Sequence, residues 1–328
     1  MIRNGRAKKA TNHNFQDSTS RLLKRRAIKI GFLPVLLILT ASLVSGQSLR
    51  FKDDLGKPLT LKNCPRRIIS LAPNVTEILL HLGLEAEIVG LTRFCDFPEK
   101  NRKIEIIGGL IDLNLEKIRA LRPDLIIGFR GNPKNLIEKM QRDGLPVFVF
   151  ESGRSFEDLF RLIRRMGELT CRLTQAKELV ARLSWQLESV ERKLAPIKEE
   201  KKAFLTLYGQ GSGLWTCGAD SFLSHVLERA RLKNVASSVR GHFLVYNREK
   251  LVEDRPEIIL IVCQNQQSFD QARDWFLRQS AFQRIPAVRE GRFYFLDENL
   301  FSRFAPRLIE AYARLTAEIY PEIFQEKP

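Results

Sequence analysis

Residues 66–83 read RRIISLAPNVTEILLHLG, and this stretch indicates a strand, a tight loop and a helix in immediate succession. The apolar run Ile68–Leu71 is typical of a buried strand, and the apolar side chains after the loop recur at the spacing of one helix face. The loop contains no glycine, although a phosphate-binding turn needs glycines so that backbone N–H groups can approach the anion. The stretch therefore predicts an α/β unit whose loop does not hold a phosphate.

The alternation of strand and helix continues along both halves of the chain. In the first half, further apolar runs lie at Ile88–Leu91, Leu125–Gly128 and Val147–Phe150. In the second half they lie at Phe204–Leu207, Ile258–Val262 and Phe293–Leu296. Strands that alternate with helical segments predict parallel sheets covered by helices. We therefore predict an α/β protein of two Rossmann-like lobes, each with a parallel-rich central sheet.

A long helix is predicted between the two halves, because residues 175–194 contain neither glycine nor proline. Its apolar residues recur every three or four positions and form one stripe, made of Leu179, Leu183, Leu187, Val190 and Leu194. We predict an N-terminal lobe over residues 47–172, a rigid backbone helix over residues 173–198 and a C-terminal lobe over residues 199–328. The ligand cleft would lie between the lobes.

A sequence pattern occurs twice, once in each half. Residues 116–127 read EKIRALRPDLII and residues 249–260 read EKLVEDRPEIIL, so the copies are 133 positions apart. Each copy runs from Glu-Lys through a short helix to Arg-Pro-acid and ends in a buried strand, and the proline stops the helix. Two copies in the same order predict equivalent positions in two pseudo-symmetric lobes.

Composition restricts the class of function. Half of the net charge of +16 comes from residues 1–46, which contain nine Lys or Arg and one acid. The remainder shows no basic run with interleaved aromatic residues, so we expect no nucleic-acid partner. There is no HExxH, GxSxG or Walker lysine, so we predict a protein that is not an enzyme. An exported α/β enzyme that uses the cleft for catalysis is the alternative from a different class.

The first 46 residues are typical of a secretory leader with an N-terminal extension. Basic residues between Arg21 and Lys29 precede the 15-residue apolar run Ile30–Val44, and the small residues Ser45 and Gly46 follow it. A retained membrane anchor is the alternative, although such a run is short for a membrane span. We expect an exported protein whose leader is cleaved near Gly46.

Five cysteines follow the leader, namely Cys64, Cys95, Cys171, Cys217 and Cys263. An odd number in an oxidising compartment leaves at least one thiol unpaired within the chain. Their wide spacing excludes a CxxC metal or redox site. We expect at most one or two disulfides, and the sequence leaves their pairing open.

Several of these segments together resemble the helical-backbone periplasmic binding proteins that serve ABC importers for vitamin B12, haem and iron-siderophores. The matching segments are residues 67–77, 89–91, 96–98, 114–116 and 302–307 and the two Arg-Pro strands. They extend from about Arg66 to Phe324, and within the family they are most similar to the members that bind vitamin B12. The resemblance implies a periplasmic, monomeric receptor that delivers a metal-chelate ligand to a permease dimer with its ATPase subunits.

Carried over residue by residue, the resemblance implies a ligand pocket with walls from both lobes. Its residues would be Phe94, Leu110, Phe129, Trp215, Phe243, Asn299 and Arg303. Aromatic faces suit the broad, partly apolar disc of a corrinoid. Leu110 and Asn299 stand where the B12-binding members have an aromatic and an acidic residue. The two cysteines that those members pair in the second lobe are here Ala230 and Thr316.

Haem or an iron-siderophore is the alternative ligand within the same class. The arginines that could surround an anionic chelate are Arg93, Arg130, Arg303 and Arg307. His242, beside Phe243, is a candidate axial ligand for a cobalt or iron centre, whereas His81 and His225 lie in helical patterns and are predicted to be structural. We expect no resident cofactor and no directly bound metal ion. The Gly-rich loop around Trp215 lacks the spacing of a nucleotide-binding fingerprint and would leave this tryptophan exposed.

Glu116 and Glu249 occupy the same place in the two copies of the repeat, each at the start of a short helix. A carboxylate there suits the helix dipole, which is one explanation for both residues. The resemblance implies another, because glutamates at these positions dock onto permease arginines in the vitamin B12 system. Two equivalent anions on two lobes match the symmetry of a homodimeric permease.

Overall fold

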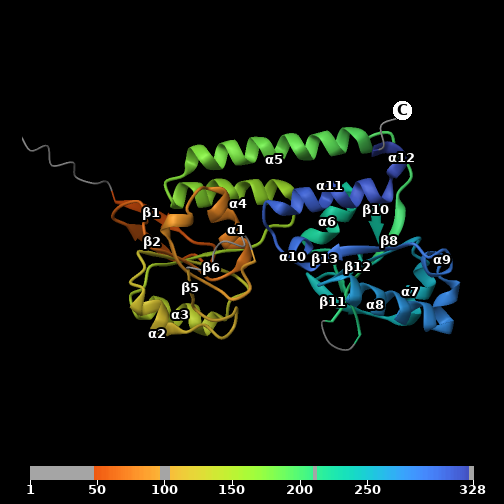
Figure 1. The fold of residues 1–328 in the computed structure, drawn as a ribbon, viewed down its shortest axis with the longest axis horizontal. Coiled ribbons are helices and arrows are strands. Elements are labelled where there is room, and N and C mark those ends of the chain that lie inside the picture. The colour runs from red at the N-terminus through yellow and green to blue at the C-terminus, as the bar shows by residue number, and fades with distance from the viewer. Residues whose placement is uncertain (1–47, 97–103, 210–212, 325–328) are drawn as a thin grey trace, which may run out of the picture. The chain divides into compact units, whose positions relative to one another are not determined.

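Figure 1 shows a computed structural model of the chain, which describes residues 48–96, 104–209 and 213–324. The predicted leader and its cleavage site near Gly46 lie outside these residues. Within the described residues, no helix has both the length and the apolar character that a bilayer span requires.

The first lobe is built on a parallel five-stranded sheet with the strand order β5-β4-β3-β6-β7. An antiparallel hairpin of two strands precedes it. The strands of the first lobe, with the hairpin strands first, are β1 (Leu49–Lys52), β2 (Pro58–Leu61), β3 (Ile68–Ser70), β4 (Ile88–Leu91), β5 (Glu105–Ile106), β6 (Leu125–Phe129) and β7 (Val147–Phe150). Its helices are α1 (Pro73–His81), α2 (Leu115–Ala120), α3 (Lys134–Arg142) and α4 (Phe156–Leu169), with the 3₁₀ turn η1 (Glu85–Glu87).

The second lobe contains a parallel four-stranded sheet with the order β10-β8-β12-β13 and an antiparallel ribbon of β9 and β11. Its strands are β8 (Lys201–Leu207), β9 (Leu214–Cys217), β10 (Leu232–Asn234), β11 (Phe243–Tyr246), β12 (Ile258–Cys263) and β13 (Phe293–Asp297). Its helices are α6 (Phe222–Arg229), α7 (Arg248–Asp254), α8 (Gln266–Arg278), α9 (Pro286–Arg289), α10 (Glu298–Phe301), α11 (Arg307–Ile319) and α12 (Pro321–Phe324), with the 3₁₀ turn η3 (Ser280–Arg284).

The predicted fold class is confirmed, and every strand predicted from an apolar run is present. Strands buried on both faces of a parallel sheet have continuous apolar sequences, which makes them visible in the sequence. The strands that the sequence did not indicate are β1, β2, β5, β9, β10 and β11. These are short strands that lie at a sheet edge or in a two-stranded pair, where burial dictates less of the sequence.

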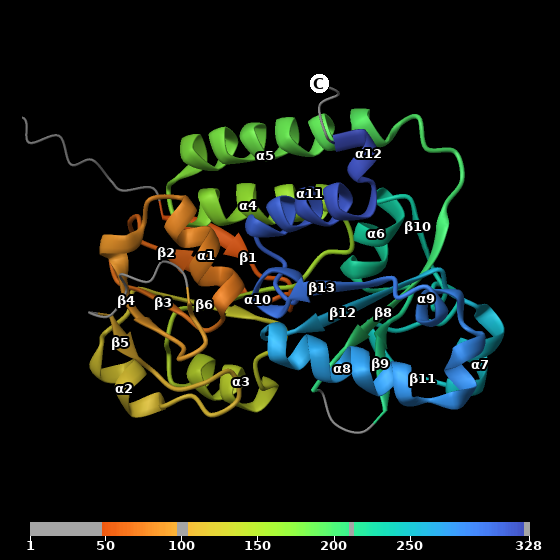
Figure 2. The same ribbon diagram turned by 45° about the vertical axis from the view of Figure 1, so that its right-hand side comes forward.

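A helix of 22 residues, α5 (Leu173–Leu194), joins the two lobes. All five residues of its predicted apolar stripe are buried, and α5 packs against α4 of the first lobe and against α11 and α12 of the second. Figures 1 and 2 show α5 along one side of both lobes, with α4 and α11 between it and the sheets. The hydrophobic core that includes the stripe continues from Leu61 in the first lobe to Tyr320 in the second. The lobe limits at residues 172 and 198 stay predictions.

Direct contacts between the lobes add to this shared core. The Phe156 ring of α4 packs against the Tyr312 ring of α11, with centroids 5.3 Å apart. Arg229 of α6 pairs with Glu157 of α4 at 3.1 Å and donates from Nε to Glu191 of α5 at 2.6 Å. A single guanidinium therefore connects both lobes to the helix that joins them.

One disulfide, Cys64–Cys171, joins the segment before β3 to the turn between α4 and α5. Its cysteines are 107 positions apart, and cross-linking a loop of that length removes about 4–5 kcal/mol of chain entropy from the unfolded state in loop-closure models. Cys95, Cys217 and Cys263 are free. Burial raises the pKa of the Cys217 thiol to about 12, so this thiol stays protonated and unreactive at neutral pH.

A hydrogen bond closes the second lobe beside Ala230 and Thr316, the positions that the resemblance matched to a cysteine pair. Ala230 and Thr316 are fully buried. Beside them, the Tyr312 hydroxyl donates to the Arg229 carbonyl at 2.9 Å. These contacts hold α11 against the end of α6.

The repeated pattern folds in the same way in both lobes. The side chains of Asn114 and Asn247 cap α2 and α7, and accept the backbone N–H groups of Lys117 and Lys250 at 2.9 and 2.8 Å. Both copies then reach an arginine with positive φ, 43° at Arg122 and 51° at Arg255, directly before the proline.

The acid after each proline anchors the copy to its sheet. The Asp124 carboxylate accepts the backbone N–H of Arg67 at 2.9 Å, immediately before β3. The Glu257 carboxylate accepts the backbone N–H of Lys202 at 2.9 Å, within β8. The two copies therefore occupy corresponding positions in the two lobes, as the sequence predicted.

We expect the ligand-free and ligand-bound forms to differ by only a small lobe rotation. A large closure would have to separate α5 from α4 or α11 and open the core that the lobes share. Small-angle X-ray scattering with and without saturating ligand should give nearly superimposable curves. A clear decrease in the radius of gyration on binding, of the kind seen in hinged binding proteins, would contradict this expectation.

Candidate ligand-binding site

A pocket of about 920 Å³ lies between the lobes. Its walls include the loops that follow β3, β4, β6 and β7 in the first lobe and β12 and β13 in the second. Open α/β sheets bind ligands at the carboxyl ends of their strands, where such loops meet. The loop after β3 contributes Ala72, Pro73 and Asn74, so the strand, loop and helix of residues 66–83 form one wall of this pocket.

The structure brings together six of the seven ligand-binding residues that the resemblance implied: Phe94, Leu110, Phe129, Phe243, Asn299 and Arg303. The seventh, Trp215, does not line the pocket. It lies half-buried in strand β9, opposite Val245 of β11, and not in the loop where the sequence placed it. Side chains two residues apart share a strand face, so Trp215 is a diagonal neighbour of Phe243 on one face of the ribbon.

Aromatic side chains from both lobes form the apolar part of the pocket: Phe94, Phe129, Phe222, Phe243 and Phe304. The rings of Phe222 and Phe304 pack together with centroids 5.4 Å apart and are largely buried. In contrast, Phe94 is 49% exposed and Phe243 is 44% exposed. Exposed aromatic rings on both sides of a pocket suit contact with the faces of a broad ligand.

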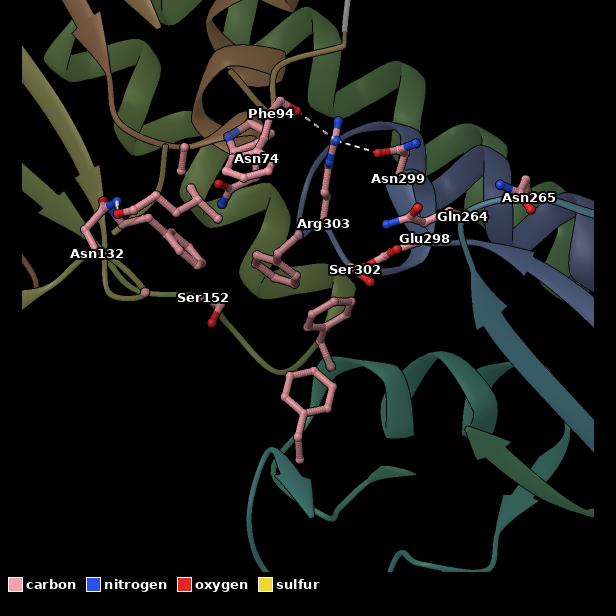
Figure 3. Close-up of a pocket in the computed structure, with 18 residues that line it drawn as sticks. Asn74, Phe94, Asn132, Ser152, Gln264, Asn265, Glu298, Asn299, Ser302 and Arg303 are labelled. Atoms are coloured by element: carbon pink, nitrogen blue, oxygen red, sulfur yellow. Dashed lines mark hydrogen bonds between the residues drawn. The ribbon is translucent and has the colours of Figure 1, made fainter. Parts of the chain in front are cut away.

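The polar part of the pocket is close to electrically neutral. Figure 3 shows its labelled polar residues, with Asn74, Asn132 and Ser152 from the first lobe and the others from the second. The full polar set is Asn74, Asn132, Ser152, Gln264, Asn265, Glu298, Asn299, Ser302 and Arg303. Amides predominate, and the two charged residues have opposite signs. The lining therefore offers hydrogen bonds without a net charge.

Asn132 holds three loops of the first lobe in place. It is buried, and its side-chain oxygen accepts the backbone N–H of Phe129 at 2.8 Å. Its amide group donates to the carbonyls of Leu71 and Leu110 at 2.9 and 3.2 Å. One side chain thus fixes the loops after β3 and β6 and the loop that carries Leu110.

Arg303 reaches from the second lobe to the first at one side of the pocket (Figure 3). Its guanidinium pairs with Asp96 and donates to the Phe94 carbonyl at 3.1 Å. It also donates to the Asn299 side chain at 2.6 Å. Most of its hydrogen-bonding capacity is therefore directed at the protein, and its position beside Phe94 is well defined.

A buried ion pair lies behind Arg303. Glu77 of α1 is only 1% exposed, and its carboxylate accepts Nε and the backbone N–H of Arg307 at 2.9 and 2.7 Å. Burial raises the pKa of Glu77, while the contacts with Arg307 act in the opposite direction. Removing one partner of such a pair leaves a buried charge, which typically costs about 3–5 kcal/mol. Glu77 and Arg307 therefore fix α1 and α11 to each other.

The remaining arginines considered for an anionic chelate do not line the pocket. Arg93 pairs with Asp112 and Arg130 pairs with Glu151, both on the surface of the first lobe. Of the set of four, only Arg303 is a pocket residue. The structure therefore does not assemble the cationic cluster that the sequence allowed.

His242 is exposed in the loop before β11 and is not a pocket residue, whereas His81 and His225 lie in α1 and α6 as predicted. Among the described residues that line the pocket there is no His, Tyr, Cys or Met. Across residues 48–96, 104–209 and 213–324, no group of three or more His, Cys, Asp or Glu side chains is placed to hold a metal ion.

Residues 68–300 match the family model described as periplasmic binding protein. The chain belongs to the periplasmic binding protein family. The uncharacterized ABC transporter substrate-binding lipoprotein YvrC of Bacillus subtilis (strain 168) is 28% identical over 278 residues, which cover 84% of this chain and 86% of YvrC.

Two further relatives of this periplasmic binding protein differ in their described ligands. The vitamin B12-binding protein of Yersinia pseudotuberculosis serotype O:3 (strain YPIII) is 24% identical over 254 residues, which cover 77% of this chain and 86% of that protein. The crystal structure of a possible iron-binding (periplasmic solute-binding) protein from Staphylococcus epidermidis ATCC 12228 has a TM-score of 0.70 and 25% identity. That match covers 79% of this chain and 100% of the other.

Sequence reasoning did not single out Asn132, Phe222 or Phe304. The position of Asn132, in the loop directly after a predicted strand, was a usable signal, because such loops form the ligand edge of the sheet. Phe222 and Phe304 are largely buried apolar residues, and nothing in the surrounding sequence distinguishes them from core residues.

Replacing Phe243 with Ala should weaken ligand binding by about 1–3 kcal/mol with little change in melting temperature, because the half-exposed ring would lose its contact with the ligand. Val245→Ala is the matched control, since Val245 lies on the same face of β11, is 53% exposed and is not a pocket residue. Titration calorimetry and thermal unfolding measure both effects. Early melting of Phe243→Ala with unchanged affinity would make Phe243 a core residue. Trp215→Ala shows in the same assay whether the ligand extends along the ribbon.

Proposed function

We propose that this protein is the substrate-binding component of an ABC importer and that it captures a corrinoid of the vitamin B12 type between its lobes. Its membership of the periplasmic binding protein family supports the class of function. The choice of ligand rests on one observation, which is the combination of exposed aromatic rings with a neutral, amide-rich polar lining.

A corrinoid matches this lining in shape and in chemistry. Its macrocycle is a broad disc with apolar faces, which Phe94 and Phe243 would contact from the two lobes. Its edge carries amide groups, which both donate and accept hydrogen bonds. The side chains of Asn74, Gln264 and Asn299 offer the same two kinds of group in the pocket.

Haem or an iron-siderophore is the second candidate, and the relative from Staphylococcus epidermidis favours it by its description. Haem carries two carboxylates and takes an axial ligand from His, Tyr, Cys or Met in most haem proteins. The pocket side chains in the described part of the chain include none of these four types, and the only arginine among them pairs with Asp96. These features favour the corrinoid.

We propose that the protein is exported, with a leader cleaved near Gly46, and works as a monomer in the periplasm. The disulfide Cys64–Cys171 fits an oxidising compartment. Its partner would be a permease dimer with ATPase subunits, as its relatives' class of transporter requires. We propose no catalytic role and no resident cofactor.

A ligand screen tests the proposal. The purified protein is mixed separately with cyanocobalamin, haemin and ferrichrome, and visible absorbance, melting temperature and chemical conversion are followed. We expect cyanocobalamin to raise the melting temperature at stoichiometric concentration and to be recovered unchanged, because a ligand that binds only the folded state stabilises it. A haemin or ferrichrome response without a cyanocobalamin response would replace the ligand. Conversion of a ligand would favour the enzyme.

We further propose that Glu116 and Glu249 dock onto the permease. Both are exposed in the first turns of α2 and α7, at corresponding positions of the two copies of the repeat. Figures 1 and 2 both place α2 and α7 on the side of the lobes away from α5. Two like charges, one on each lobe, would face two equivalent cationic patches of a symmetric permease.

The double variant Glu116→Lys with Glu249→Lys should abolish transport and permease binding in a reconstituted importer, while ligand affinity and melting temperature stay nearly unchanged. Exposed charge pairs steer encounter and fix register, so wild-type binding to the permease should also weaken as salt rises. The control is Glu178→Lys with Glu188→Lys, which makes the same charge change on exposed positions of α5. Full transport by the first double variant would exclude the docking assignment.

A further inference from the structure

The two exposed aromatic residues of the pocket, Phe94 and Phe243, lie on segments that are each tied to the opposite lobe. On the side of Phe94 the tie is Arg303, which reaches from the second lobe to the Phe94 carbonyl and to Asp96. On the side of Phe243 the tie is Arg154, which reaches from the loop between β7 and α4 to Asp220 in the second lobe at 2.8 Å.

Asp220 connects this ion pair to the strand that carries Phe243. Its Oδ2 accepts the backbone N–H of Gly241 at 2.8 Å, and its own backbone N–H donates to the Gly241 carbonyl at 3.1 Å. Gly241 has a φ of 122°, and Phe243 follows two residues later as the first residue of β11. Asp220 thus holds the backbone at Gly241, only two residues before Phe243, and so restrains the start of β11.

The surroundings of Asp220 lower its pKa, so that it is ionised at neutral pH. The hydrogen bond from the Gly241 N–H lowers this pKa most, and the nearby guanidinium groups of Arg154 and Arg240 lower it further. An ionised carboxylate can accept the Gly241 N–H with one oxygen and Arg154 with the other, and the distances show this division.

The ribbon packs on the second lobe through β9, which contacts β8, and through the buried residues Leu214 and Tyr246. Phe243 lies at the end of β11 opposite Tyr246, where the core does not hold the strand. Phe243 is half-exposed, so core packing does not determine its position. The Arg154 side chain is 66% exposed, and an ion pair at that exposure adds little to global stability.

We propose that Arg154 and Asp220 form a strap between the lobes that positions Phe243 against the ligand. Asp220 is the positioning residue, and Arg154 connects it to the loop that also carries the pocket residue Ser152. Neither Arg154 nor Asp220 lines the pocket. The proposal rests on the proposed function in one respect, namely that Phe243 touches the transported ligand.

The strap itself is tested without ligand. Hydrogen exchange followed by mass spectrometry reports on a peptide that covers residues 239–246, in wild type and in Arg154→Gln and Asp220→Asn. We expect this peptide to exchange several-fold faster in both variants, because the Gly241 N–H and the start of β11 lose their restraint. Arg314→Gln is the matched control, since Arg314 is also 66% exposed and pairs with Glu310 of its own helix. This control should exchange as wild type does.

The consequence for binding is tested with cyanocobalamin as the probe. We expect its dissociation to be roughly three- to tenfold faster from Arg154→Gln and Asp220→Asn, with melting temperatures close to wild type. Salt screens exposed ion pairs, so raising the salt concentration should speed dissociation from wild type and from Arg314→Gln more than from Arg154→Gln. A merely structural role would change melting temperature and would not produce this difference in salt dependence.

The outcomes separate the strap from the ligand assignment. Unchanged exchange of residues 239–246 in Arg154→Gln overturns the strap, and this variant decides the matter even where Asp220→Asn fails to fold. Faster exchange with unchanged cyanocobalamin dissociation overturns the positioning role of Asp220. Failure of wild type to bind cyanocobalamin overturns the proposed ligand, and the exchange experiment alone then decides whether the strap exists.

Discussion

The burial of one apolar stripe of α5 is the interaction on which the rest of the structure depends. The stripe from Leu179 to Leu194 packs against helices of both lobes, so one hydrophobic core extends through both, beside a further core in each lobe. A shared core of this kind resists opening, so we expect the distance between the two sheets to change little when a ligand binds. The loops at their carboxyl ends face each other across the pocket.

A pocket whose width changes little on binding would owe its specificity to the side chains that line it. Preformed sites avoid the free-energy cost of ordering on binding, so contacts made there convert more fully into affinity. Near the pocket, Arg303, Arg307 and Arg154 form ion pairs that connect one lobe to the other. The lining itself is left to aromatic rings and amides. Charged side chains therefore surround the pocket while the pocket lining itself stays nearly neutral.

Much of this architecture could be predicted from the sequence, because buried elements require apolar residues at regular positions. The strands β6 and β12 are buried on both faces and need continuous apolar runs, whereas α5 is buried along one face and needs an apolar stripe. Each of these patterns could be recognised in the sequence. The ribbon of β9 and β11 could not be recognised in this way, since β9 follows a glycine-rich segment and three of the four residues of β11 are exposed or half-exposed. Trp215 was therefore assigned to a loop and not to a strand.

The parts of the site that the sequence could not supply depend on contacts between distant segments. Asn132 acts through the carbonyls of Leu71 and Leu110, and Cys64 pairs with Cys171 across 107 positions. Neither pairing leaves a local signal, because each partner would look the same with a different neighbour. The repeat is the exception, since its two copies meet their partners in the same way at Asp124 and Glu257. The internal repeat therefore allowed long-range structure to be predicted where a single segment would not have been enough. It also gives the two lobes corresponding positions at α2 and α7.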